Sequence, residues 1–151
     1  MKKINNTTKI DVKLGTPERF GYAWNIASKI KDVNEDQFLN WTKVIKDKNY
    51  WIGKDILDAG CGIGRNTYWP ISYGAKSAIA FDMDERTLEA ARKNLEKYTN
   101  VKIEKHSIYD IPYKNKFDIS FSIGVVHHLE FPEKAISELV KSTKPGGKVL
   151  V

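Results

Sequence analysis

The residues most capable of chemistry form a glycine-rich turn that begins at Asp58. The turn reads Asp58-Ala59-Gly60-Cys61-Gly62-Ile63-Gly64. It lies between an apolar stretch over residues 55–59 and a helical pattern over residues 66–72. Glycine permits a sharp turn and lets a ligand lie against the backbone, and the N-terminus of a helix favours an anionic group. In parallel α/β sheets ligands bind at the carboxyl ends of strands, which is where this turn must lie.

A second acidic residue, Asp82, follows the next apolar stretch and stands 24 residues after Asp58. A carboxylate there can accept hydrogen bonds from both hydroxyls of a ribose. Asp58 precedes the first glycine by two residues, where it would attract an ammonium group and repel a pyrophosphate. A dinucleotide-binding turn also needs glycine at position 65, which is Arg65. These features predict a ligand with a ribose and a zwitterionic end, with a nucleotide-dependent oxidoreductase as the alternative interpretation.

Two adjacent histidines, His127 and His128, follow a predicted strand over residues 117–122. An unperturbed histidine pKa of about 6.5 suits proton transfer near neutral pH, so both are candidate catalytic bases. The structural alternative is that one ring packs or caps while the other faces water. Cys61 is interpreted as a small residue of the turn and not as a nucleophile.

The elements that must position these residues alternate along the chain. Strands are predicted at 55–59, 77–82, 101–106, 117–122 and 148–151, and helices at 36–48, 66–72, from 85 onward and at 132–142. Asp36 and Asp84 are the expected N-caps, Pro70 is expected late in its helix or at its end, and residues 144–147 are expected to form a turn. Alternation of this kind predicts an α/β fold, a Rossmann-like doubly wound parallel sheet with helices on both faces.

Composition sets the broad class. The chain has 151 residues, 41% hydrophobic and 29% charged, which suits one globular domain. The apolar runs are too short to cross a bilayer, and the first residues do not resemble a signal peptide, so we expect a cytoplasmic protein without a membrane partner. A single cysteine and no zinc-ligand spacing predict no metal.

The positive charge is concentrated at the start of the chain. Residues 1–54 hold 11 Lys and Arg against 6 Asp and Glu, whereas residues 55–151 hold 14 against 13. The basic residues are scattered, so we interpret them as a solvated surface and expect no nucleic-acid partner. Residues 1–53 are predicted to be a helical or lid segment, with Tyr22 and Trp24 either closing over the ligand or packing as ordinary helix aromatics.

Five segments occur in a characteristic order and spacing. They are residues 56–64, 80–84, 106–113, 117–129 and 144–151. In this combination the sequence resembles the class I S-adenosylmethionine-dependent methyltransferases over residues 54–151. The resemblance implies a methyltransferase with S-adenosyl-L-methionine as its cofactor. It is nearest to enzymes that act on quinones, sugars and antibiotic-like compounds, which implies a small-molecule methyl acceptor. An RNA methyltransferase is the alternative, although the Asn/Asp-Pro-Pro-Tyr/Phe motif of amino-group methylation is replaced by Ser122-Ile123-Gly124-Val125.

The resemblance also assigns binding roles residue by residue. The methionine part of the cofactor is assigned to Asp58, Ala59, Gly60, Cys61, Gly62 and Gly64. The ribose and adenine are assigned to Asp82, Met83, Ser107 and Ile108, and the sulfonium side to Ile123 and Gly124. Ser107 departs from many relatives, which carry an aspartate there that bonds the adenine amino group. A neutral serine accepts that bond less strongly, or a backbone carbonyl replaces it.

The family sheet has seven strands in the order 3-2-1-4-5-7-6, of which this sequence supplies the first five along the chain. The sequence therefore resembles a form truncated after strand five, and a fragment that binds the cofactor but turns over poorly or not at all is a further alternative to an active methyltransferase. A fifth strand at an exposed edge also predicts self-association through that edge.

Overall fold

The computed structural model describes residues 29–45 and 47–151. Its strands are β1 (Asp55–Ala59), β2 (Ser77–Asp82), β3 (Val101–Lys105), β4 (Phe117–Phe121) and β5 (Thr143–Leu150). Its helices are α2 (Val33–Trp41), α3 (Arg65–Ser72), α4 (Glu85–Leu95) and α5 (Pro132–Ser142), with short 3-10 turns η1 (Lys48–Trp51) and η2 (Val126–His128). All strand pairs are parallel and the sheet order is β3-β2-β1-β4-β5. The predicted α/β fold class and the order of its five strands are confirmed.

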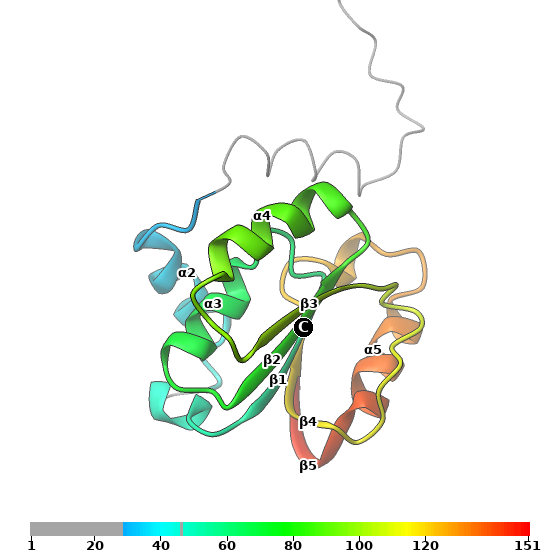
Figure 1. Cartoon of the computed structure of the whole chain (residues 1–151). Helices are drawn as coiled ribbons and strands as arrows, with labels where there is room; N and C mark the ends of the chain where they lie inside the picture. The colour runs from blue at the N-terminus through cyan, green and yellow to red at the C-terminus, as the bar shows by residue number, and fades with distance from the viewer. Residues whose placement is uncertain (1–28, 46) are drawn as a thin grey trace, which may run out of the picture.

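The helices cover both faces of this sheet (Figure 1). Helices α3 and α4 pack on β1, β2 and β3, and α2 packs on α3, whereas α5 packs on β4 and β5 on the other face. Neighbouring residues of β1 pack alternately into the two layers, because successive side chains of a strand point to opposite faces. Ile56 lies in a cluster with Phe38 and Trp51, and Leu57 lies in a cluster with Leu139. The sheet is therefore buried on both faces, as its apolar strands require.

The first described helix differs from its prediction over residues 36–48. Helix α2 begins at Val33 rather than at Asp36 and ends at Trp41. At its end the Phe38 carbonyl accepts both the Thr42 N–H at 2.9 Å and the Thr42 hydroxyl at 2.8 Å, and the chain then tightens into a turn in which the Ile45 N–H donates to the Thr42 carbonyl at 2.7 Å. Phe38 is fully buried, so its burial anchors the helix to the core. The predicted lid residues Tyr22 and Trp24 lie outside the described residues.

Two other boundaries were predicted with partial success. Pro70 lies inside α3 and does not end it, which is the first of the two expected outcomes. Strand β5 begins at Thr143, although a turn was predicted over residues 144–147. Pairing with β4 is irregular there, since Phe117 pairs with Thr143 but Ile119 pairs with Lys148. The predicted turn residues thus lie in the irregular part of the strand, where Gly146 has φ +79°.

Candidate functional site

The turn between β1 and α3 is held against the end of β2. The backbone N–H groups of Gly60 and Cys61 both donate to the Phe81 carbonyl, at 2.8 and 2.9 Å. Gly60 has φ +82°, and a Cβ there would lie 2.7 Å from a Val125 methyl carbon. Position 60 therefore needs glycine both for its backbone angle and for the close approach of the loop after β4.

Asp82, at the carboxyl end of β2, ties this turn to the next one. Its Oδ2 accepts from the Gly62 N–H at 2.9 Å, and its Oδ1 accepts from Met83 at 2.7 Å and Asp84 at 3.1 Å. An ionised carboxylate offers about four acceptor positions, so capacity is left for a ligand hydroxyl. Asp84 caps α4 as predicted, since its side chain accepts from the Arg86 backbone N–H.

Asp58 lies behind the turn in the interior. Its side chain is 1% exposed and accepts a 2.6 Å hydrogen bond from the Thr67 hydroxyl of α3. Burial raises the pKa of Asp58 to about 7, and the negative charge of Asp82 adds to the rise although the Thr67 bond opposes it. The carboxyl thus links β1 to α3, and its predicted role toward an ammonium group stays a prediction.

A cavity of about 230 Å³ opens at the carboxyl ends of β1, β2, β3 and β4. Nine residues of the predicted site line it: Gly60, Cys61, Gly62, Asp82, Met83, Ile108, Ile123, Gly124 and His128. Five others of the predicted site are not among its lining residues: Asp58, Ala59, Gly64, Ser107 and His127. Segments as distant in sequence as residues 60–63 and 123–125 meet here because parallel strands bring their carboxyl ends to one edge.

The remaining lining residues were not predicted from the sequence. They are Trp41, Ile63, Arg65, Asn66, Phe81, Asp84, Thr87, His106, Val125 and Leu129. Most of them lie inside the five segments described above or directly after one, and this position was the signal that could have found them. Trp41 carries no such signal, because it belongs to α2 and reaches the cavity through packing, with the Arg65 guanidinium 5.3 Å from its ring centre.

The histidine pair lies at the end of η2. The two ring centres are 3.9 Å apart, and both side chains are exposed. His128 lines the cavity, whereas His127 is not among its lining residues. Of the two candidate bases, His128 is therefore the one that a bound ligand can reach.

Ser107 adopts a local structural role. Its hydroxyl oxygen accepts from the Tyr109 backbone N–H at 3.2 Å, and its carbonyl accepts from Asp110 at 3.2 Å. Both contacts tighten the turn after β3. The neighbouring Ile108 is buried and lines the cavity, so the two residues predicted to flank adenine differ in their access to it.

The chemistry of the cavity fits an amino-acid-bearing nucleoside. The Asn66 Oδ1 atom is buried without a hydrogen-bond partner among the described residues, at the first turn of α3. A buried acceptor of this kind needs a donor such as an ammonium group, and the helix N-terminus beside it favours a carboxylate. Phe81 and Ile108 supply apolar contacts for a purine at another part of the wall. Within the described part of the chain, no side-chain group suited to a metal ion is found.

Comparison with known proteins identifies the family. Residues 57–151 match the model of a methyltransferase domain. The chain is 31% identical over 114 residues to the tRNA U34 carboxymethyltransferase of Klebsiella pneumoniae, covering 74% of this chain and 34% of that protein. It is 32% identical over 101 residues to the ribosomal protein L11 methyltransferase of Photobacterium profundum, covering 66% of this chain and 33% of that protein.

A solved S-adenosylmethionine dependent methyltransferase from Mesorhizobium loti has a similar fold. Its TM-score is 0.60 at 25% identity, over 65% of this chain and 45% of that chain. The chain spans about a third of the length of the curated relatives it matches. None of the helices described for residues 29–45 and 47–151 is long and apolar enough to cross a membrane.

Proposed function

The chain belongs to the methyltransferase domain family and has S-adenosyl-L-methionine as its cofactor, and we propose that it transfers the cofactor's methyl group to a small-molecule acceptor. This family membership decides against the oxidoreductase interpretation. The observation that supports cofactor binding is the 2.9 Å bond from Gly62 N–H to Asp82 Oδ2 in the wall of the cavity. It joins the predicted methionine-binding turn to the predicted ribose-binding carboxylate.

The residues of the chain have separate tasks in this proposal. The α3 N-terminus and Asn66 hold the amino-acid end, and Asp82 holds the ribose. The cofactor supplies a methyl carbon activated by a positively charged sulfur, so the protein's main task is alignment. Trp41 and Leu129 line the cavity and offer apolar contacts to an acceptor. We assign to His128 the removal of a proton from an acceptor hydroxyl or acidic carbon.

An RNA acceptor is the second candidate function, since one of the relatives reported above is named as a tRNA U34 carboxymethyltransferase. The excess of basic residues before position 55 is the feature of this chain that such a substrate would use. The small-molecule proposal is supported by the partly apolar cavity, which would enclose a small acceptor beside the cofactor.

The test combines binding and transfer. Calorimetry should detect binding of S-adenosylmethionine and S-adenosylhomocysteine, and NAD should not bind. Transfer of a tritiated methyl group is then measured on a panel of hydroxylated and amino-bearing small molecules, and in parallel on bulk tRNA. We expect transfer to at least one small molecule and none to tRNA. Salt-sensitive labelling of tRNA alone would support the RNA alternative, and binding without any transfer would support the predicted form that lacks turnover.

The assignment of His128 predicts a difference between adjacent histidines. With an acceptor that must lose a proton, His128→Ala should lower the transfer rate about 100-fold, because a positioned base contributes a factor of that order. His127→Ala is the matched control and should stay within about threefold of the unchanged protein. Both variants should bind S-adenosylhomocysteine equally well. Equal rates in the two variants would remove the assignment.

A further inference from the structure

Glu104, on β3, organises a polar cluster beside the cavity. Its side chain is 10% exposed, and its Oε2 accepts from the Tyr113 hydroxyl at 2.7 Å and contacts His106 Nε2 at 2.9 Å. Its Oε1 pairs with the Lys102 ammonium group at 2.5 Å. Burial opposes ionisation of Glu104, but hydrogen bonds from Lys102, Tyr113 and His106 together hold its pKa below the usual value. Glu104 is therefore an ionised acceptor at neutral pH.

An ionised Glu104 determines which nitrogen of His106 carries the proton. A carboxylate accepts hydrogen bonds and cannot donate them, so Nε2 must be the protonated nitrogen. In the neutral imidazole, Nδ1 is then an acceptor with a lone pair. Tyr113 strengthens this arrangement, because its own pKa is raised to about 12 by burial and by the bond to Glu104, so its hydroxyl stays a donor.

His106 is also fixed in position. Its ring packs edge-on against Phe81, with ring centres 6.0 Å apart and planes at 84°, and both residues line the cavity. Its backbone N–H donates to the Asp82 carbonyl at 3.3 Å. His106 thus adjoins Asp82, the residue predicted to bind the ribose, and both line the cavity. The turn hydroxyl of Ser107 bonds to Tyr109 and is not among the lining groups.

We propose that His106, oriented by Glu104, is a specificity-determining residue that accepts a hydrogen bond from the exocyclic amino group of the cofactor's adenine. The inference rests on the proposed function, because it presumes an adenosine-bearing ligand in this cavity. It assigns the amino group to the residue before Ser107, whose hydroxyl lies in the backbone turn. An oxygen in place of the amino group would meet the His106 lone pair with one of its own.

The test compares two ligands that differ at that group. Calorimetry is carried out with S-adenosylhomocysteine and with S-inosylhomocysteine, in which a carbonyl replaces the amino group. The unchanged protein should prefer the adenine ligand by about 30-fold, since mismatching one buried hydrogen bond has effects of this order. His106→Phe, which keeps an aromatic ring against Phe81, should reduce that preference to less than about threefold.

Two further variants separate recognition from folding. Glu104→Gln should weaken the preference, because an amide can donate as well as accept and no longer fixes the imidazole tautomer. Glu89→Gln, at an exposed position of α4 outside the cavity lining, is the matched control and should keep the full preference. In the ligand-free protein, nitrogen NMR should report protonation of His106 at Nε2.

The outcomes distinguish this inference from the function on which it rests. Failure of the unchanged protein to bind either ligand would contradict the proposed function. Tight binding with an adenine preference that survives in His106→Phe, or a proton on His106 Nδ1, would overturn the inference alone.

Discussion

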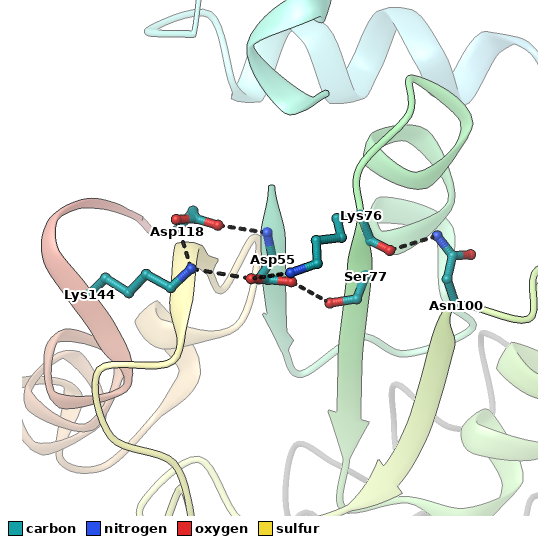
Figure 2. Close-up of polar contacts among 6 residues, drawn as sticks. All are labelled: Asp55, Lys76, Ser77, Asn100, Asp118 and Lys144. Atoms are coloured by element: carbon teal, nitrogen blue, oxygen red, sulfur yellow. Dashed lines mark hydrogen bonds and ion pairs between the residues drawn. The ribbon is translucent and has the colours of Figure 1, made fainter. Parts of the chain in front are cut away.

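The aspartates at the two ends of the central strands differ in the partners of their carboxylates. At the amino edge, defined by Asp55, Lys76, Ser77, Asp118 and Lys144, the carboxylates are paired with cations (Figure 2). Lys144 bridges the two aspartates at 3.2 and 3.0 Å. Asp118 also accepts the Asp55 backbone N–H at 2.8 Å. Hydrogen bonds from neighbouring groups outweigh burial and lower the pKa of both aspartates.

At the carboxyl edge, defined by the ends of β1 to β4, no ion pair to Asp58 or Asp82 is found among the described residues. A hydroxyl bonds Asp58 and backbone N–H groups bond Asp82. At the amino edge Asp55 and Asp118 share a cationic partner, whereas at the carboxyl edge Asp58 and Asp82 have none in the described part of the chain, although the neighbouring Asp84 and Glu104 pair with Arg86 and Lys102. Such a difference is expected where one edge stabilises the fold and the other binds a ligand.

The largest expected effect is a pH dependence that comes from Asp58. Its pKa is about 7 in the folded protein and near 3.8 when unfolded. Between these values the folded state keeps a proton that the unfolded state releases, so this group lowers stability as pH rises, by about 4 kcal/mol in all. Asp58→Asn cannot ionise and should lose this decline. Urea unfolding at several values between pH 4 and pH 8 measures it.

The aspartates of the amino edge should change the free energy of unfolding in the opposite direction, and over a lower range of pH. Because the pKa values of Asp55 and Asp118 are lowered on folding, their contribution is present above the unfolded pKa and is lost as pH falls below about 4. Asp118→Asn is therefore the control and should keep the decline between pH 4 and pH 7. If the free energy of unfolding of Asp58→Asn declined with pH as it does in the unchanged protein, Asp58 would not be the source of the decline.

Asp82→Ala should have the next largest effect, on binding. Loss of the carboxylate removes the predicted bonds to the ribose, and each bond to a charged group contributes about 1.5 to 3 kcal/mol. We expect S-adenosylhomocysteine to bind about 100-fold more weakly by calorimetry. Asp55→Ala, at the other edge, should bind it with unchanged affinity. Equal affinity in the Asp82 variant and the unchanged protein would refute the ribose assignment.

Asp118→Ala should lower stability without affecting the ligand. The change removes the acceptor of the Asp55 N–H and one partner of Lys144, at an expected cost of about 2 kcal/mol in the free energy of unfolding. Denaturant unfolding measures the loss, and calorimetry should show normal S-adenosylhomocysteine binding in the folded variant. A loss of affinity without a loss of stability would show that the two edges are not separate in function.

The sequence predicted the carboxyl edge better than the amino edge. The turn after β1 and the position of Asp82 could be predicted, because glycine and acidic residues recur at fixed offsets from strand ends. The cap at Asp84 followed from the same local patterns, whereas the strand order came from the resemblance to the methyltransferase family. The bridge by Lys144 could not be predicted from the sequence, because it joins the start of β5 to the starts of β1 and β4 through tertiary contacts alone.

The same limit explains the errors inside the site. Trp41 is the last residue of α2 and lines the cavity, and the buried Phe38 packs that helix against the core. Helical periodicity continues past that point in the sequence, so the pattern predicted a longer helix. The depth of Asp58 was also beyond the sequence, because it depends on neighbours that the motif does not contain, and its role toward an ammonium group stays a prediction.

The smallest expected effect concerns the second lysine of the amino edge. Lys76 and Lys144 both reach Asp55 Oδ2, but the Lys76 ammonium group is 3.7 Å away and its side chain is 69% exposed. An exposed, singly paired lysine contributes little, so Lys76→Ala should change the free energy of unfolding by less than about 0.5 kcal/mol. Lys144→Ala should destabilise the protein more, because it leaves two aspartates without their shared cation. Equal losses in thermal unfolding would mean that total positive charge at this edge matters, and not the bridging geometry.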